Sequence, residues 1–255
     1  MIRQEDHVVT DIRLSGNLAI TNTTWILAIF RASEFDWLSS EQEFRRAREL
    51  GPNAEDVFLN YALYYLIPTR RFDEAIAALK RAVEVNPLSP YPQFVLGYAY
   101  YANRQWALAI EHFQRAIELD ADYYFAHQYI GFTNLQTGKL DEGVAACETA
   151  SKILGTGHWS LAIPCVAYAK SGKINEARRL LKELSNAANN AYVPPSAFAW
   201  IYCSLGEIEK SLDWFEKAIN EQDYLIIPTY AFPVYDPLRS HPRYKALIRK
   251  MNLEP

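Results

Sequence analysis

The sequence is poor in cysteine and in long apolar runs, and each shortage excludes a class of protein. Its three cysteines, Cys147, Cys165 and Cys203, are odd in number and far apart, so we expect buried reduced thiols rather than a disulfide framework or a zinc site. The longest apolar runs, such as 62–67 and 25–30, are too short to span a bilayer. The N-terminus has no apolar region of the secretory type. We therefore expect a cytoplasmic protein without a membrane partner.

An excess of positive charge is also missing. The chain has 26 Lys and Arg against 30 Asp and Glu, which gives a formal net charge of −4. A surface for nucleic acid needs a concentrated basic stripe. The short pairs Arg45-Arg46 and Arg70-Arg71 fall where a helix and a turn are expected to face water. We therefore expect no nucleic-acid partner.

The spacings of known catalytic and metal-binding motifs are absent as well. The five histidines are scattered, with no H-E-x-x-H and no Cys/His cluster at ligand spacing. No G-x-S-x-G, Walker or G-x-G-x-x-G motif occurs, and Gly155-Thr156-Gly157 is expected to be a loop. Carboxylate pairs such as Asp73-Glu74 begin helices, where they stabilise the positive end of the helix dipole. We expect no enzyme activity, no cofactor and no metal.

What the sequence does contain is a pattern that repeats every 34 residues. Its clearest copy spans 90–123. Steps of 34 from Ala109 reach Ala75, Gly143, Ala177 and Ser211, and steps from Phe113 reach Leu79, Cys147, Leu181 and Phe215. Small residues at fixed places let two helices approach closely, while large ones fill the space to the next unit. One helical hairpin cannot bury its apolar face alone, so each unit needs a neighbour.

The copy at 90–123 also carries a recognisable order of residue types. Leu96, Gly97 and Tyr100 are followed by Ala109 and Phe113. This order, L-G-x-x-Y and then A-x-x-x-F, resembles a tetratricopeptide unit, which is two antiparallel helices in about 34 residues. The resemblance implies an all-α, right-handed α-solenoid of five to six helix–turn–helix repeats with a C-terminal capping helix. The alternative is a non-repetitive helical bundle whose alignment is fortuitous.

The period sets the expected boundaries. We expect an N-terminal arm at 1–17 and an array at 18–225, with repeats near 18–55, 56–89, 90–123, 124–157, 158–191 and 192–225. Gly138, Gly172 and Gly206 are 34 residues apart and should adopt the left-handed conformation in the turns within repeats. The pattern is weaker at Pro164, which falls inside an expected helix. Residues 226–255 should form an extended segment, because prolines block a helix there, and then the capping helix.

Three stretches point to a narrower resemblance. Phe35-Asp36-Trp37, Phe72-Asp73-Glu74-Ala75 and the segment 236–244 resemble the tetratricopeptide modules of microbial regulatory proteins. Such modules commonly follow a winged-helix DNA-binding, kinase or cyclase domain. The effector domain is absent from this sequence. Either the module acts alone, or it is part of a larger protein.

The concave side of such a solenoid is lined by the first helix of each repeat, and here it is aromatic. The second, fifth, ninth and twelfth positions of these helices should face it. The candidate peptide-binding residues are Asn60, Tyr64, Tyr91, Phe94, Tyr98, Tyr101, Phe125, Gln128, Phe132, Trp159 and Trp200. Chaperone-binding tetratricopeptide domains use Lys, Asn and Arg there, whereas this groove has no Lys or Arg. An exposed apolar patch marks a binding site; the alternative is that some rings are covered from within.

We expect the chain's own C-terminal segment to cover part of this groove. Tyr230, Phe232 and Tyr235 should fold back towards the concave side near Trp200 and Trp159. Twelve extended residues span about 40 Å at most, so the segment should stop short of Tyr64 and leave the rings nearer the N-terminus open.

The hypothesis is therefore a protein-interaction module or scaffold that binds an extended or helical peptide segment in an aromatic concave groove. Its partner is a protein or peptide of unknown identity, and self-association stays open. The alternative is the regulatory sensor half of a signalling or transcription protein whose effector domain is missing here. An enzyme would need titratable residues converging in the groove, and the sequence shows too few.

Overall fold

The computed structural model describes residues 21 and 23–254, and throughout that part of the chain the regular elements are helices. The expected N-terminal arm at 1–17 lies outside the described residues. Residues 23–33 are helical and precede the first labelled element. The elements are α2 (Trp37–Leu50), α3 (Glu55–Tyr61), η1 (Ala62–Leu66), α4 (Phe72–Val85), α5 (Pro90–Ala102), α6 (Trp106–Leu119), α7 (Tyr124–Gln136), α8 (Leu140–Leu154), α9 (His158–Lys170), α10 (Ile174–Ala187), α11 (Pro195–Ser204), α12 (Ile208–Asn220), α13 (Ile226–Thr229), η2 (Pro233–Leu238) and α14 (Pro242–Lys250).

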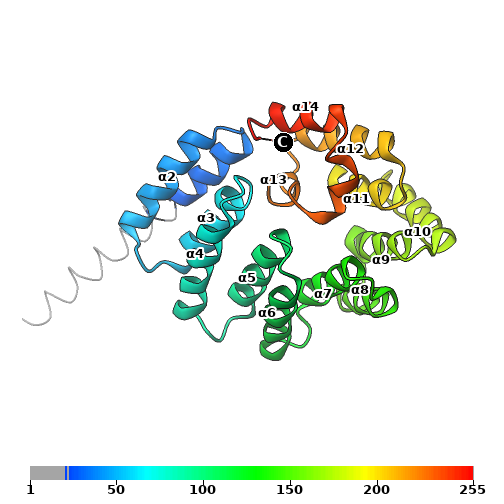
Figure 1. The fold of residues 1–255 in the computed structure, drawn as a ribbon, viewed down its shortest axis with the longest axis horizontal. Coiled ribbons are helices and arrows are strands. Elements are labelled where there is room, and N and C mark those ends of the chain that lie inside the picture. Colours follow the sequence, from blue (N-terminus) through cyan, green and yellow to red (C-terminus); the bar gives the residue numbers. More distant parts are fainter. Residues whose placement is uncertain (1–20, 22, 255) are drawn as a thin grey trace, which may run out of the picture.

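These helices form hairpins that stack in chain order, as the 34-residue period predicts. Each hairpin has a first and a second helix, such as α5 with α6 and α7 with α8, and neighbouring hairpins pack side by side (Figure 1). The fold is therefore an all-α solenoid of helix–turn–helix repeats. The buried residues of successive hairpins form one continuous core along the array, because each hairpin covers the apolar face of the one before it.

The small residues of the repeat lie where two helices of a hairpin touch. Ala109 and Ala116 on α6 have no exposed surface. On α5, a Cβ atom added to Gly97 would lie 2.6 Å from the ring of Phe113, which is closer than atoms can pack. The close approach of α5 and α6 therefore requires the small residues that the pattern identified.

The turns within repeats share one backbone conformation. Gly138, Gly172 and Gly206 have φ of 80°, 81° and 75°, as predicted. Arg70 and Arg104 occupy the same step of the period in earlier repeats and have φ of 60° and 59°. Glycine is thus used at this left-handed position only in the later repeats.

Helix α9 continues through Pro164, the weak point of the sequence pattern. Proline has no N–H, so the carbonyl of Ser160, four residues earlier, loses its helical partner. Ser151 Oγ donates a hydrogen bond to that carbonyl at 2.6 Å instead. A side chain of the preceding helix α8 therefore replaces the missing backbone bond.

The segment after α12 differs from its prediction. It is not extended: it forms two short helical turns, α13 and η2. Pro228 lies within the first turn of α13, and Pro233 is the first residue of η2. Helices do not use backbone N–H groups at these positions, so Pro228 and Pro233 are compatible with short helices. Pro237 lies inside η2, near its end.

The array curves until its last helix, α14, lies beside the first described repeat (Figure 1). Helix α14 buries Tyr244, Leu247 and Ile248, and the Tyr244 ring lies 5.1 Å from that of Phe215 on α12, as expected of a capping helix. Beyond this cap the chain contacts the first repeat. Trp37 Nε1 donates a hydrogen bond to the Met251 carbonyl at 2.7 Å, and Asn252 Nδ2 donates one to the Phe35 carbonyl at 3.1 Å. Met251 and Asn252 thus link the last helix to the first described repeat and close the array.

Candidate functional site

Most of the predicted groove residues are covered. Phe94, Tyr98, Tyr101, Gln128, Phe132 and Trp200 are buried, and Asn60, Tyr64 and Trp159 are half-buried. Tyr91 and Phe125 keep 39% and 38% of their surface exposed. In the central part of the groove the rings are therefore covered by the chain itself, which is the alternative to an open binding surface.

The C-terminal segment provides that cover, and its expected return to the concave side is confirmed. The Phe232 ring centroid lies 4.6 Å from that of Tyr98 and 5.2 Å from that of Tyr101. Tyr98 also donates a hydrogen bond from its hydroxyl to the Pro228 carbonyl at 3.2 Å. The central rings thus belong to the core.

The segment extends further than predicted. Helix α13 contacts η1, the helical turn that contains Tyr64, and the Tyr230 hydroxyl donates to the Pro68 carbonyl. The prediction that the segment stops short of Tyr64 is therefore wrong, because the curvature of the array brings η1 close to its far end. The helix is also widened there: Ile67 N–H donates to the carbonyl of Ala62, five residues earlier, at 2.9 Å.

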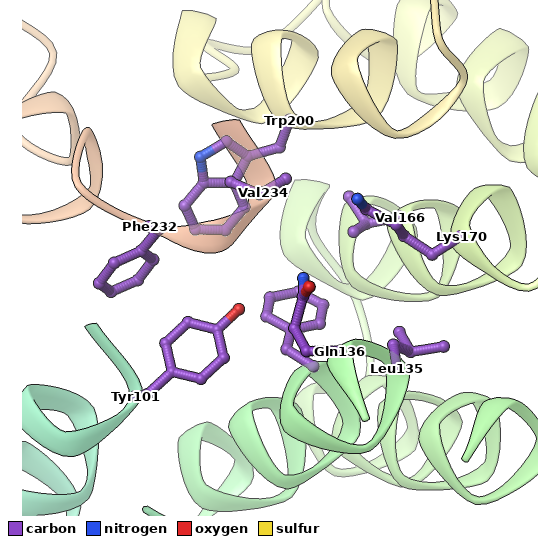
Figure 2. A pocket seen from close by; sticks show the side chains of 9 residues that line it. Tyr101, Leu135, Gln136, Val166, Lys170, Trp200, Phe232 and Val234 are labelled. Carbon is purple, nitrogen blue, oxygen red and sulfur yellow. The ribbon is translucent and has the colours of Figure 1, made fainter. Parts of the chain in front are cut away.

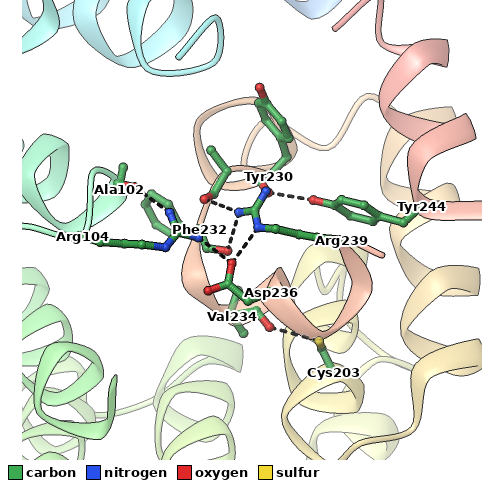
Figure 3. Close-up of polar contacts among 10 residues, drawn as sticks. Ala102, Arg104, Cys203, Tyr230, Phe232, Val234, Asp236, Arg239 and Tyr244 are labelled. Carbon is green, nitrogen blue, oxygen red and sulfur yellow. Dashed lines mark hydrogen bonds and ion pairs between the residues drawn. The ribbon is translucent and has the colours of Figure 1, made fainter. Parts of the chain in front are cut away.

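Polar contacts fix the segment in place (Figure 3). Asp236 Oδ1 accepts hydrogen bonds from Arg104 Nη2 at 2.5 Å and from Arg239 Nε at 2.6 Å. Arg239 Nη2 donates in turn to the Ala231 carbonyl at 2.6 Å. Asp236 therefore links the segment to the turn after α5.

Almost no free space remains beneath the segment. Figure 2 shows the cavity between Tyr101, Trp200, Phe232 and Lys170, and its volume is about 10 Å³. That is the space of about one water molecule. The central groove therefore has no room for the side chain of a partner.

A larger opening lies where α7 and α9 begin. It has a volume of about 240 Å³ and is called the edge cleft here. Its lining residues are Tyr124, Phe125, Gln128, Tyr129, His158, Trp159, Trp200, Tyr224 and Leu225. The rings of Tyr124 and Phe125 are stacked with centroids 4.0 Å apart, and those of Trp159 and Trp200 lie 5.8 Å apart. The Tyr224 side chain is 56% exposed at its mouth.

Two titratable groups accompany these rings. His158 Nε2 is buried and has no hydrogen-bond partner within the described part of the chain. Burial lowers the pKa of His158, and Asp223 opposes this shift only in part, so the imidazole is neutral at pH 7. The Asp223 side chain is 2% exposed and accepts hydrogen bonds from Ser196 N–H at 2.8 Å and Leu225 N–H at 3.0 Å.

Sequence reasoning identified only part of this cleft. Phe125, Gln128, Trp159 and Trp200 were among the predicted groove residues, whereas Tyr124, Tyr129, His158, Tyr224 and Leu225 were not. Tyr124 and His158 are the first residues of their repeats, one place before the positions used for the prediction. Tyr224 lies in the turn after α12. The turns between repeats share an edge with the starts of the first helices, and aromatic residues in those turns were the available signal.

Other kinds of site find no support among the described residues. No three His, Cys, Asp or Glu side chains in that part of the chain are grouped so that they could hold a metal ion. Burial raises the pKa of Cys165 to about 12 and that of Cys203 to about 11, so both thiols stay protonated at neutral pH. In the described residues, no helix combines the length and the apolar character that crossing a bilayer requires.

Comparison with known proteins agrees with this architecture. Residues 69–124 match the family model described as tetratricopeptide repeat. Anaphase-promoting complex subunit 3 of Schizosaccharomyces pombe is 22% identical over 204 residues, which are 77% of this chain and 30% of that protein. Tetratricopeptide repeat protein 13 of Homo sapiens is 30% identical over 110 residues, which are 43% of this chain and 13% of that protein.

A solved structure extends the likeness to nearly the whole chain. The crystal structure of the APC/C hetero-tetramer Cut9–Hcn1 superposes with a TM-score of 0.60 at 12% identity, covering 98% of this chain and 46% of that one. The chain spans less than a third of the length of both curated relatives. The matched repeat, the hairpin stacking and this superposition agree. In its fold the chain is a solenoid of helix–turn–helix repeats, and its residues 69–124 match the tetratricopeptide repeat model.

Proposed function

We propose that this chain is a protein-interaction scaffold that binds a peptide segment of its partner in the edge cleft. The observation that carries the proposal is the group of rings left open beside a central groove that is filled. Phe125 is 38% exposed and Tyr224 is 56% exposed, and the half-buried Trp159 lies in the same cleft. Full burial of such a ring contributes on the order of 1.5–3 kcal/mol, so two or three rings can supply most of the affinity for a short peptide.

The edge cleft is a better site than the central groove for a steric reason. A peptide in the central groove would have to displace Phe232, which is 1% exposed and packed among tyrosine rings. A peptide in the edge cleft displaces only water. Its side chains would enter a volume of about 240 Å³ instead of about 10 Å³. The original expectation of a groove lined by Tyr98 and Phe132 is therefore replaced by a site at the starts of α7 and α9.

Selection of peptides from an unbiased displayed library tests this proposal. Enriched peptides are synthesised and titrated against the wild-type chain and against Phe125→Ala, which removes one exposed wall of the cleft. We expect the affinity to fall about tenfold or more in Phe125→Ala. Phe30→Ala is the matched control, because Phe30 is 54% exposed on the helix at 23–33. Peptides that bind both variants equally well would refute the edge cleft as the site.

A further inference from the structure

A buried carboxylate lies immediately behind the wall of the edge cleft. Asp223 precedes Tyr224 and Leu225, which both line the cleft, and Leu225 N–H donates to Asp223 Oδ1. Both hydrogen-bond partners of this carboxylate are backbone N–H groups. None of the nine lining residues is Lys or Arg. The cleft therefore contains no positive side chain of its own.

The simplest structural role of the Asp223 carboxylate is to cap helix α11. Ser196, whose N–H it accepts, is the second residue of that helix. A helix start carries roughly half a positive charge, whereas a carboxylate carries a full negative one. Capping therefore leaves a net negative charge beside the cleft. In agreement, although burial is the main cause of the raised pKa of Tyr224 and a hydrogen bond with the Trp159 side chain lowers that pKa, the charge of Asp223 raises it further.

The walls of the cleft suit a planar cation. Tyrosine and tryptophan rings attract a guanidinium group placed over their faces, and arginine stacks on such rings better than lysine does. Arginine also brings five N–H donors, which need acceptors. The neutral His158 has one unprotonated ring nitrogen, and its buried Nε2, which has no partner within the described residues, accepts a hydrogen bond when the ring proton is on Nδ1. Gln128 adds an amide oxygen to the same cleft.

We infer that the edge cleft binds an arginine side chain of the partner peptide, with its guanidinium stacked on the aromatic rings that line the cleft and its charge matched by Asp223. This inference rests on the proposed function and specifies the chemistry of the partner. An acidic side chain would meet Asp223 without a balancing cation. A purely apolar side chain would leave His158 Nε2 buried and unpaired, which costs free energy.

Titrations with short capped peptides test the inference. The probe is a capped Gly-Ser-Arg-Ser-Gly peptide, and its matched control replaces arginine by citrulline, which has the same shape without the charge. Binding is followed by nuclear magnetic resonance of the ¹⁵N-labelled tryptophan indoles. We expect the arginine peptide to shift the Trp159 signal and to bind about tenfold more tightly than the citrulline peptide.

Two variants of the protein sharpen the test. Asp223→Asn should abolish the preference for arginine over citrulline, because it removes the negative charge. This change also alters a buried cap, so Tyr224→Ala, at an exposed position, is the second variant. It should weaken binding of the arginine peptide about fivefold or more and leave the thermal unfolding midpoint unchanged. Phe30→Ala should affect neither quantity.

The possible outcomes separate the two proposals. Equal binding of the arginine and citrulline peptides, or tighter binding of a glutamate peptide, overturns the inference and leaves the peptide site standing. Tighter binding of free tetramethylammonium than of the arginine peptide overturns arginine as the occupant. If no probe shifts the Trp159 signal at millimolar concentration, the inference fails, and the library selection decides separately whether the cleft binds other peptides.

Discussion

Ala109 occupies the contact between the two helices of the hairpin at 90–123 and has no exposed surface. We expect Ala109→Leu to destabilise the chain by roughly 1–3 kcal/mol, because the larger side chain would force α5 and α6 apart. The urea midpoint of unfolding measures this change. Leu108→Ala, at the neighbouring position that is 39% exposed, is the control and should change the midpoint little. Equal midpoints for Ala109→Leu and wild type would contradict the packing assignment.

His112 on α6 makes the stability depend on pH. Burial lowers its pKa, the charges of Arg115 and Lys80 lower it further, and Glu111 opposes them. The unfolded chain therefore binds the proton more readily, so the free energy of unfolding falls as pH drops below about 6.5. We expect the urea midpoint to fall between about pH 7.5 and about pH 5.5.

The variant His112→Gln identifies the residue responsible. His112 Nδ1 and Gln93 Oε1 lie 2.9 Å apart, and a glutamine at 112 offers a donor without titrating. The variant should lose less stability over this pH range than the wild type. His158, whose pKa burial also lowers, accounts for part of the remainder. Identical pH dependence in both proteins would argue against His112.

At the residue scale, packing was predictable and the edge cleft was not. Ala109 and Phe113 recur at a fixed period because every repeat needs the same helix contact, so their burial follows from spacing alone. Asp223 and Tyr224 lie in the turn after α12. The 34-residue pattern does not include this turn. The position of Asp223 and Tyr224 beside Trp159 depends on how the complete array curves.

Within the C-terminal segment, taken as one structural element, Phe232 lies at the centre of the packing. It is 1% exposed, and its ring lies between 4.6 and 5.8 Å from the rings of Tyr98, Tyr101 and Tyr129. We expect Phe232→Ala to lower the free energy of unfolding by about 3–5 kcal/mol, since it leaves a cavity among three rings. Urea denaturation gives this value, and faster hydrogen exchange in 226–238 locates it.

The control for Phe232→Ala is Tyr192→Ala. Tyr192 is also aromatic but 64% exposed, so its loss should cost less than about 0.5 kcal/mol. If Phe232→Ala were as mild as this control, the segment would be a loosely held arm instead of part of the core.

The helices of the array were predictable as elements, whereas the segment after them was only half predicted. Its return to the concave side follows from its three aromatic residues, which need an apolar surface. Its local conformation was assigned wrongly, because Pro228, Pro233 and Pro237 were read as helix breakers. Pro228 and Pro233 stand in first turns, where a missing N–H has no effect, and Pro237 lies near the end of the short helix η2.

The closure of the array is a property of the whole molecule, because it joins the last helix to the first described repeat. We expect deletion of residues 242–255 to expose the apolar face of the last repeat, because Tyr244, Leu247, Ile248 and Met251 then leave the core. It also removes the hydrogen bonds from Trp37 to Met251 and from Asn252 to Phe35. The truncated chain should bind more of a dye for apolar surfaces and have a larger radius of gyration in small-angle X-ray scattering.

Deletion of residues 254–255 alone is the control for this truncation, since it leaves α14 and both hydrogen bonds in place. Unchanged dye binding and radius after removal of 242–255 would show that α14 neither caps the array nor closes it.

An open array of repeats frays from its ends, because a terminal unit has one neighbour where an inner unit has two. Here the bonds of Trp37 and Asn252 give the first and last units a second neighbour, one to the other. No unit of the closed array then has a single neighbour, so unfolding has no terminal unit at which to start. The closed array should melt in a single sharp transition, and the same repeats without the link should melt gradually from their ends.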